Sequence, residues 1–141
     1  MNEQEFKNRT RNLALRIIKL VEALPRGQVA DVIGRQLLRS ATSVGANYRA
    51  ACRGKSEGDF AHKLAIVEEE ADESLYWMEL LIEAGIVSQA RLTPLMSEAN
   101  EIIAMTVASI RTLRRRSHST LQIALYTASN TLRRGRTLRR R

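Results

Sequence analysis

Cysteine, proline and aromatic residues are scarce in this 141-residue sequence, which has one cysteine, two prolines and 4% aromatic residues. The single cysteine, Cys52, excludes an internal disulfide and a multi-cysteine zinc site. The low aromatic and proline content argues against a β-sandwich and favours long helices. No run of about 18 apolar residues is present, so the sequence predicts no membrane span. The N-terminus lacks a cationic start followed by an apolar stretch, and we therefore expect a cytoplasmic protein.

Acidic residues are also absent after Glu101, whereas ten arginines lie between Arg111 and Arg141. The formal net charge of +8 is therefore unevenly distributed. Residues 1–55 hold 11 basic and 4 acidic side chains, and residues 56–110 hold 2 basic and 11 acidic side chains. A basic segment without local acids predicts binding to phosphates, which arginine contacts bidentately. The alternative is expansion of a short repeat, because Thr-Leu-Arg-Arg occurs at 112–115, 131–134 and 137–140.

Apolar residues recur at spacings of three and four in four segments, as in packed helices. The predicted helices span about 6–24, 29–53, 56–85 and 92–113. Pro25 should end the first helix, Ser56 should cap the third, and Gly85 should end it. Short connections between long amphipathic helices predict an all-α, up-down-up-down antiparallel four-helix bundle over residues 1–116. Residues 117–141 lose the pattern and are expected to form an arginine-rich, mostly disordered tail.

Small and polar residues in the second predicted helix indicate close helix packing. Gly45 should weaken that helix by about 1 kcal/mol relative to alanine, so tertiary contacts must compensate, either inside the bundle or at a subunit interface. Glu70 lies beside the apolar seam of the third helix and needs a polar partner, for which Asn47 or Arg39 is suitable. The residues assigned to helix packing or an interface are Ala41, Gly45, Ala46, Asn47, Glu70 and Trp77.

Patterns typical of enzymes are weak in this sequence. A di-iron bundle needs two Glu-x-x-His motifs, whereas only Asp59-x-x-His62 is present, and the second histidine is His118. Arg49 and Arg53 could lower the pKa of Cys52, but a free, half-buried thiol is the favoured interpretation. Glycine-rich phosphate loops and nucleophile elbows are absent. The sequence predicts a non-enzymatic protein without a metal or cofactor.

Five motifs of the second and third predicted helices stand out: Arg35-Gln36-Leu37-Leu38-Arg39-Ser40, Ser43-Val44-Gly45-Ala46-Asn47-Tyr48-Arg49, Phe60 with Leu64, Ala71-Asp72-Glu73-Ser74-Leu75-Tyr76-Trp77, and Glu79-Leu80-Leu81. In order and spacing they resemble a bacterial family, the 23S rRNA intervening-sequence proteins. The resemblance covers roughly residues 5–115. It departs from the family at Ala50, where an acidic residue is expected, and in the arginine-rich tail.

The resemblance implies a non-catalytic four-helix bundle that forms cyclic homo-oligomers, often pentamers. The family name reflects genes found inside rRNA insertions. Related proteins are accessory subunits of reverse transcriptases in diversity-generating retroelements, where a basic surface engages RNA and the polymerase. RNA is therefore the nucleic acid favoured by the resemblance.

Together, these patterns predict an oligomeric bundle that binds nucleic acid through the basic first two helices and the tail. The alternative is a protein-interaction scaffold, or an accessory subunit that docks a partner such as a reverse transcriptase through its acidic face or its small-residue face. For the basic helices, the alternative role of the arginines is solubility or pairing with the third helix. The predicted nucleic-acid-binding residues are Arg9, Arg16, Lys19, Arg35, Arg39, Arg49, Arg53, Arg114, Arg115, Arg116, Arg133, Arg134, Arg136, Arg139, Arg140 and Arg141.

Overall fold

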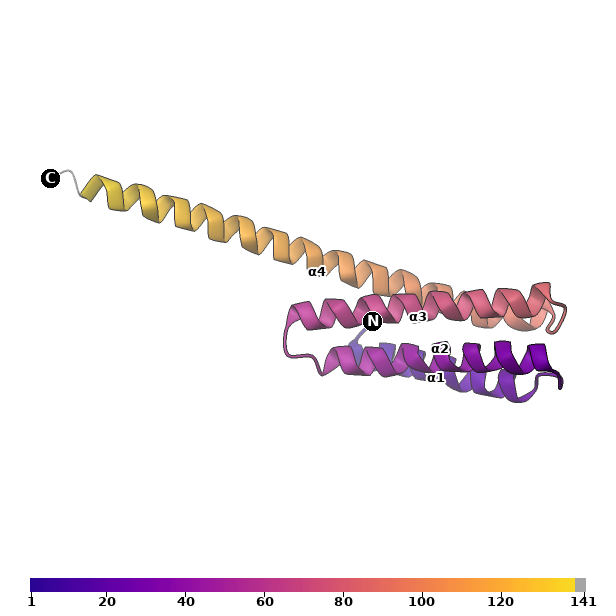
Figure 1. Cartoon of the computed structure of the whole chain (residues 1–141). Coiled ribbons are helices and arrows are strands. Elements are labelled where there is room, and N and C mark those ends of the chain that lie inside the picture. The colour runs from indigo at the N-terminus through magenta and orange to yellow at the C-terminus, as the bar shows by residue number, and fades with distance from the viewer. Residues whose placement is uncertain (139–141) are drawn as a thin grey trace.

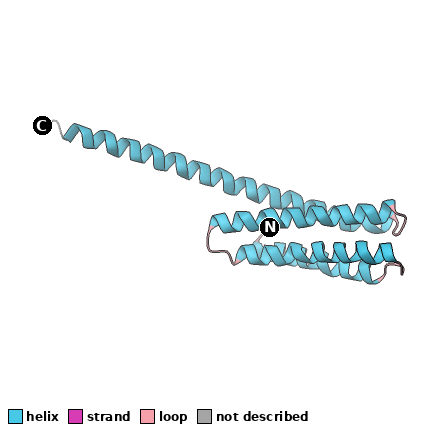
Figure 2. Cartoon of the chain, in the orientation of Figure 1, coloured by secondary structure: helices cyan, strands magenta, loops and turns pink. Residues whose placement is uncertain are grey.

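The computed structural model describes the backbone of residues 1–138 and the side chains through residue 131. Within this range the chain forms four helices and no strand (Figures 1 and 2). The helices are α1 (Glu3–Glu22), α2 (Gln28–Cys52), α3 (Glu57–Glu83) and α4 (Gln89–Leu138). No helix described here has a segment both long and apolar enough to cross a membrane. The all-α four-helix bundle predicted from the apolar spacing is confirmed.

Consecutive helices run antiparallel and surround a shared core (Figure 1). α1 lies beside α2 and α4, and α3 lies beside the same two helices. The α2–α3 contact is the most extensive and the α1–α4 contact the least extensive. The start of α1, the end of α2 and the start of α3 therefore meet at one end of the bundle, and α4 leaves the bundle there (Figure 1).

Local signals in the sequence fix the helix ends. Asn2 accepts a hydrogen bond from the backbone N–H of Glu5, and the Glu5 carboxylate accepts one from the Asn2 N–H, which completes a capping box. Ser56 accepts from the backbone N–H of Asp59 at 3.1 Å and caps α3. Gly85 has a φ of +72° just after α3, a left-handed conformation that glycine adopts without a steric penalty.

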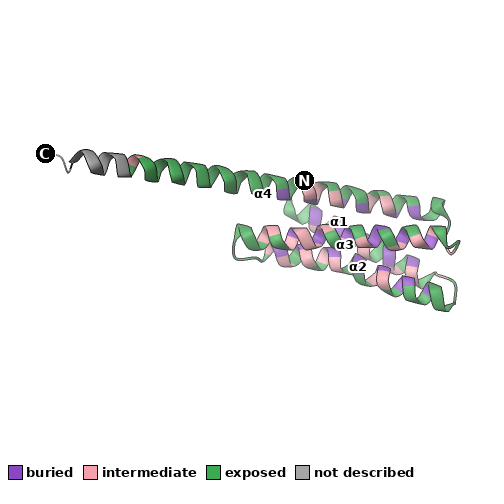
Figure 3. Cartoon of the chain, turned by 45° about the horizontal axis from the view of Figure 1, so that its top comes forward, coloured by how far each residue is buried: buried purple, intermediate pink, exposed green. Residues whose placement is uncertain are grey.

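The apolar spacing also predicts the core. Its buried members come from all four helices and form one cluster between the helices, and none of them is among the described side chains of the projecting end of α4 (Figure 3). The side chains that are fully buried include Leu13, Ile17, Leu37, Val44, Leu64, Val67, Met78, Leu92 and Ile102. Thr10 and Thr106 are buried with them. The seam predicted for each helix therefore faces inward.

The prediction that residues 117–141 are mostly disordered is corrected by the structure. α4 continues as one helix to Leu138 and projects beyond the bundle (Figure 1). No proline or glycine lies between Pro94 and Gly135, so nothing in this segment breaks the backbone hydrogen bonds. Hydroxyls also bond to the preceding turn, as Thr127 does to the carbonyl of Ile123 at 2.8 Å. Residues 139–141 lie outside the described part.

Candidate nucleic-acid interface

A basic groove runs between α1 and α2 at the end of the bundle where α4 leaves it. Arg11 on α1 and Arg49 and Arg53 on α2 line it, and all three are exposed. Lys7 also lines the groove, but its ammonium is 2.7 Å from the Glu3 carboxylate. The other lining residues are neutral: Gln4, Asn8, Thr10, Ala14, Thr42, Gly45 and Ala46. A groove lined by arginines and no acids attracts anions.

Gly45 lines this groove at a point where α1 and α2 approach each other closely. A Cβ atom on Gly45 would lie 3.3 Å from Thr10 Oγ1 and 3.5 Å from the Thr10 backbone carbonyl carbon. The close packing predicted around Gly45 is therefore an internal contact with α1. Ala41 is fully buried, whereas Ala46 is exposed in the groove. Asn47 donates to the Ser43 carbonyl at 2.9 Å, within its own helix.

Arg9 does not belong to the groove and is held by acids of α4. Its guanidinium donates two hydrogen bonds to the Glu98 carboxylate, both of 2.8 Å, and also pairs with Glu101. The hydrogen bonds from Arg9 lower the pKa of Glu98 below its ordinary value. This pairing links α1 to α4 across their limited contact and leaves Arg9 unsuited to bind phosphate.

Replacing Glu98 with glutamine should lower the free energy of unfolding at pH 7 by about 1–2 kcal/mol, because Arg9 loses a charged partner. Since the folded-state pKa of Glu98 is lowered, its stabilisation is fully present above the unfolded value of about 4.3. That stabilisation is lost as the pH falls through the lower folded value. Urea titrations of the wild type and Glu98→Gln should therefore differ less at about pH 3 than at pH 7.

The matched control for this prediction is Glu22→Gln, because Glu22 is exposed on α1. This change should leave the free energy of unfolding within about 0.5 kcal/mol of the wild type at both pH values. A Glu98→Gln effect of the same size at both pH values would contradict the charged pairing.

Arg39 is also engaged, in this case by α3. Its guanidinium lies 3.4 Å from the Glu70 carboxylate and pairs with Glu73. The Trp77 indole N–H donates to the same Glu73 carboxylate at 3.1 Å. These hydrogen bonds, chiefly the one from Arg39, lower the pKa of Glu73. Of the two partners predicted for Glu70, Arg39 is therefore the one in contact, and it links α2 to α3.

A buried pair of hydroxyls completes the α2–α3 contact and was not predicted from the sequence. Ser40 and Ser74 are fully buried, and their Oγ atoms lie 2.9 Å apart. Each hydroxyl also lies within hydrogen-bond distance of a backbone carbonyl of its own helix. The only signal in the sequence was that both serines interrupt an apolar seam, and this signal does not identify the partner.

The remaining predicted arginines and lysine of α1 and α2 do not meet at one site. Arg16 and Lys19 are exposed and line a shallow hollow that also contains Arg9 and Glu98. Arg35 lies near the other end of the bundle, in a hollow shared with Glu22 and Asp31. Of the basic residues predicted on these two helices, only Arg49 and Arg53 lie in the groove that no acid lines, and Arg11 joins them.

The arginines of α4 form a second basic surface at the same end of the bundle. Arg111, Arg114, Arg115 and Arg116 are exposed and lie in the part of α4 that follows the last buried core residue, Ile110. Within the described side chains, none of the four forms an ion pair with an acid. Arg133, Arg134 and Arg136 are in the helix, but their side chains lie outside the described part. Arg139, Arg140 and Arg141 lie outside it entirely.

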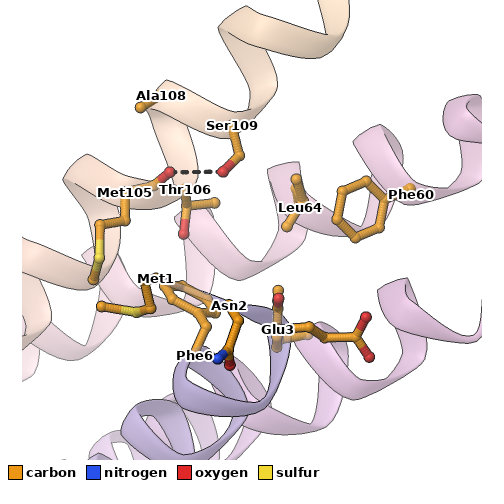
Figure 4. Close-up of a pocket in the computed structure, with 11 residues that line it drawn as sticks. Met1, Asn2, Glu3, Phe6, Phe60, Leu64, Met105, Thr106, Ala108 and Ser109 are labelled. Carbon is orange, nitrogen blue, oxygen red and sulfur yellow. Dashed lines mark hydrogen bonds between the residues drawn. The ribbon is translucent and has the colours of Figure 1, made fainter.

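The hollow shown in Figure 4 is lined by apolar side chains and by polar ones, of which Glu3 is the one acid. Its lining includes Phe6, Phe60, Leu64 and Met105, and its volume is about 360 Å³. Nearby, Cys52 is half-buried, and burial raises the pKa of its thiol, which stays protonated at neutral pH. The neighbouring arginines therefore do not activate Cys52. Among the described residues, no three His, Cys, Asp or Glu side chains are grouped as metal ligands.

The sequence profile of the 23S rRNA-intervening sequence protein family matches residues 2–108. The chain belongs to this family. A similar solved structure is that of a protein of unknown function from the S23 ribosomal protein family of Bacteroides thetaiotaomicron. The two sequences are 34% identical, the TM-score is 0.74, and the match covers 79% of this chain and 99% of that chain. A comparison with curated proteins gives no match.

The family match ends before the arginines of α4. The Gly45 packing and the α1–α2 groove lie within residues 2–108 of this 23S rRNA-intervening sequence protein, and the core residue Ile110 lies just beyond them. Arg111 and everything after it lie beyond the matched residues. The projecting part of α4 is therefore not part of the family profile.

Proposed function

We propose that this protein is a non-enzymatic, oligomeric four-helix bundle that binds nucleic acid, with RNA favoured. The observation that carries the proposal is the set of exposed arginines at the point where α4 leaves the bundle, with no acidic residue later in the chain. The α1–α2 groove opens at the same end and adds Arg11, Arg49 and Arg53. We further propose that the protein acts in the cytoplasm as a homo-oligomer, with the five subunits that the family resemblance implies.

These two surfaces suit the sugar–phosphate backbone and not base edges. Arginine forks bind phosphate oxygens, and each phosphate neutralised releases condensed counterions. Arg114, Arg115 and Arg116 are consecutive, so they point roughly 100° apart around the helix and cannot all face one groove of a duplex. Tyr126 is the one exposed aromatic residue among the described side chains of α4, so base stacking contributes little. Binding should therefore depend on phosphate density and little on sequence.

The test is a titration of the nuclease-treated protein with single-stranded RNA at several salt concentrations. If about six arginines contact phosphates, the logarithm of the binding constant should fall with the logarithm of the salt concentration with a slope of about −4. Two RNAs of equal length and different sequence should bind alike. No binding at about 50 mM salt would refute the proposal. If purification after nuclease treatment recovered one partner polypeptide and no RNA, the accessory-subunit alternative would be favoured instead.

A further inference from the structure

The projecting part of α4, residues 114–138, is here called the α4 extension. All its described side chains are exposed except Asn130, and its apolar residues are among the most exposed of the molecule: Leu121 at 62%, Ile123 at 66%, Leu125 at 68% and Tyr126 at 71%. Serine, threonine and asparagine, which are weak helix formers, are frequent in it. A helix of this kind is marginal in water without tertiary packing. The α4 extension therefore needs a partner.

The charge of the α4 extension indicates which kind of surface can bind it. It contains arginines and no acidic residue, so pairing two extensions side by side would bring like charges together. Its apolar residues also occupy two sides of the helix, because Leu121 and Leu125 lie roughly opposite Ile123 and Tyr126 at about 100° per residue. The partner surface must therefore be acidic and must also offer apolar contact.

Such a surface exists on α3. Five exposed residues follow one another at spacings of three, four, three and four and therefore share one face of α3. They are Glu69, Asp72, Tyr76, Glu79 and Glu83, here called the α3 stripe. Tyr76, at its centre, is 52% exposed. Among the described side chains, the four acids of the α3 stripe form no ion pair.

The α4 extension cannot reach the α3 stripe of its own molecule. Leu113, Ser117 and Leu121 pass the first turns of α3, where a shallow hollow is also lined by Glu57, Gly58 and Ala61. From there α4 runs away from the bundle, whereas the α3 stripe extends along α3 in the opposite direction (Figure 1). The complementary surfaces can therefore meet only between two molecules.

We propose that the α4 extension of one molecule docks on the α3 stripe of a second copy. Arginines of the extension contact the acids of the stripe, and exposed apolar residues of the extension contact Tyr76. The contact joins two different surfaces, so each molecule can use both, and the assembly grows head to tail until it closes. The inference rests on the oligomeric part of the proposed function and adds to it a contact made by a segment outside the family profile. It leaves arginines free for phosphate, because neighbouring arginines point to different sides of the helix.

The test uses light scattering of the nuclease-treated full chain over a range of concentrations. Two double variants reverse charge on one surface each: Asp72→Lys with Glu79→Lys on α3, and Arg115→Glu with Arg116→Glu on α4. Each variant alone should dissociate at a concentration at least roughly tenfold higher than the wild type. Mixed in equal amounts, the two variants should regain association, because each supplies a surface that is complementary to one on the other.

Two control variants each reverse one exposed charge that lies outside both surfaces. They are Glu22→Lys and Arg91→Glu, and each should leave the molar mass of the assembly unchanged. Regained association in the mixture would show that both variants fold. Equal masses for the wild type and both variants at every concentration would overturn the inference. The inference would also be overturned if each variant lost association and the mixture of the two did not regain it. RNA binding is measured separately on the α3 variant, whose arginines are intact, so failure of docking and failure of nucleic-acid binding remain distinguishable.

Discussion

Replacing Arg111, Arg114, Arg115 and Arg116 with glutamine should lower RNA affinity on the order of a hundredfold at about 0.1 M salt. Each arginine that neutralises a phosphate releases about 0.7 of a counterion from single-stranded nucleic acid. Losing four such contacts should therefore reduce the slope of log affinity against log salt by about 3. Glutamine has nearly the helix propensity of arginine, so α4 should stay helical. Fluorescence titrations at several salt concentrations would measure both the affinity and the slope.

Two double variants distinguish the effect of where the arginines lie from the effect of net charge on RNA affinity. Arg115→Gln with Arg116→Gln changes α4, and Arg26→Gln with Arg91→Gln removes two exposed arginines at the other end of the bundle. Both variants lower the net charge by the same amount. The α4 variant should bind RNA roughly tenfold more weakly, and the control should bind within about twofold of the wild type. Equal losses in the two variants would mean that only overall charge matters.

The bundle could be predicted from the sequence because the spacing of apolar residues along the chain shows which residues share the buried face of a helix. In each helix the apolar residues are separated by three or four positions in the sequence. Residues with that spacing share one face of a helix wherever the helix lies in the fold. Phe6, Leu13 and Ile17 are therefore buried as predicted. The helix ends at Ser56 and Gly85 follow from backbone chemistry within a few residues. None of these features depends on which helices are neighbours.

The candidate site was harder to predict because it depends on contacts between distant residues. Arg9 and Arg39 look like free cations in the sequence, yet one is neutralised by Glu98 on α4 and the other by Glu73 on α3. Their spacing within α1 and α2 does not reveal these partners. The α4 extension was missed for another reason. Apolar residues at spacings of three and four reveal a helix only where one of its faces is buried. The α4 extension is helical but exposed, so it lacks this spacing and was predicted to be disordered.

Replacing Gly45 with leucine should lower the free energy of unfolding by about 2–3 kcal/mol, the effect of overpacking a well-packed contact. The first added carbon would already lie 3.3 Å from Thr10 Oγ1, and Thr10 is fixed by burial and by its hydrogen bond to the Lys7 carbonyl. The larger side chain must push α1 away from α2. Leucine favours helix by up to about 1 kcal/mol relative to glycine, which offsets part of the loss. Urea denaturation would measure the net change.

The neighbouring position provides the matched control, because Ala46 is in the same helix and exposed in the groove. Ala46→Leu places the same side chain at an exposed position, so the free energy of unfolding should stay within about 0.5 kcal/mol of the wild type. If Gly45→Leu were as stable as Ala46→Leu, the crossing of α1 and α2 would not depend on glycine. Because Gly45 lines the basic groove between α1 and α2, separating these helices should move Arg11 away from Arg49 and weaken RNA binding together with stability. Loss of stability with unchanged RNA binding would place the nucleic acid on α4 alone.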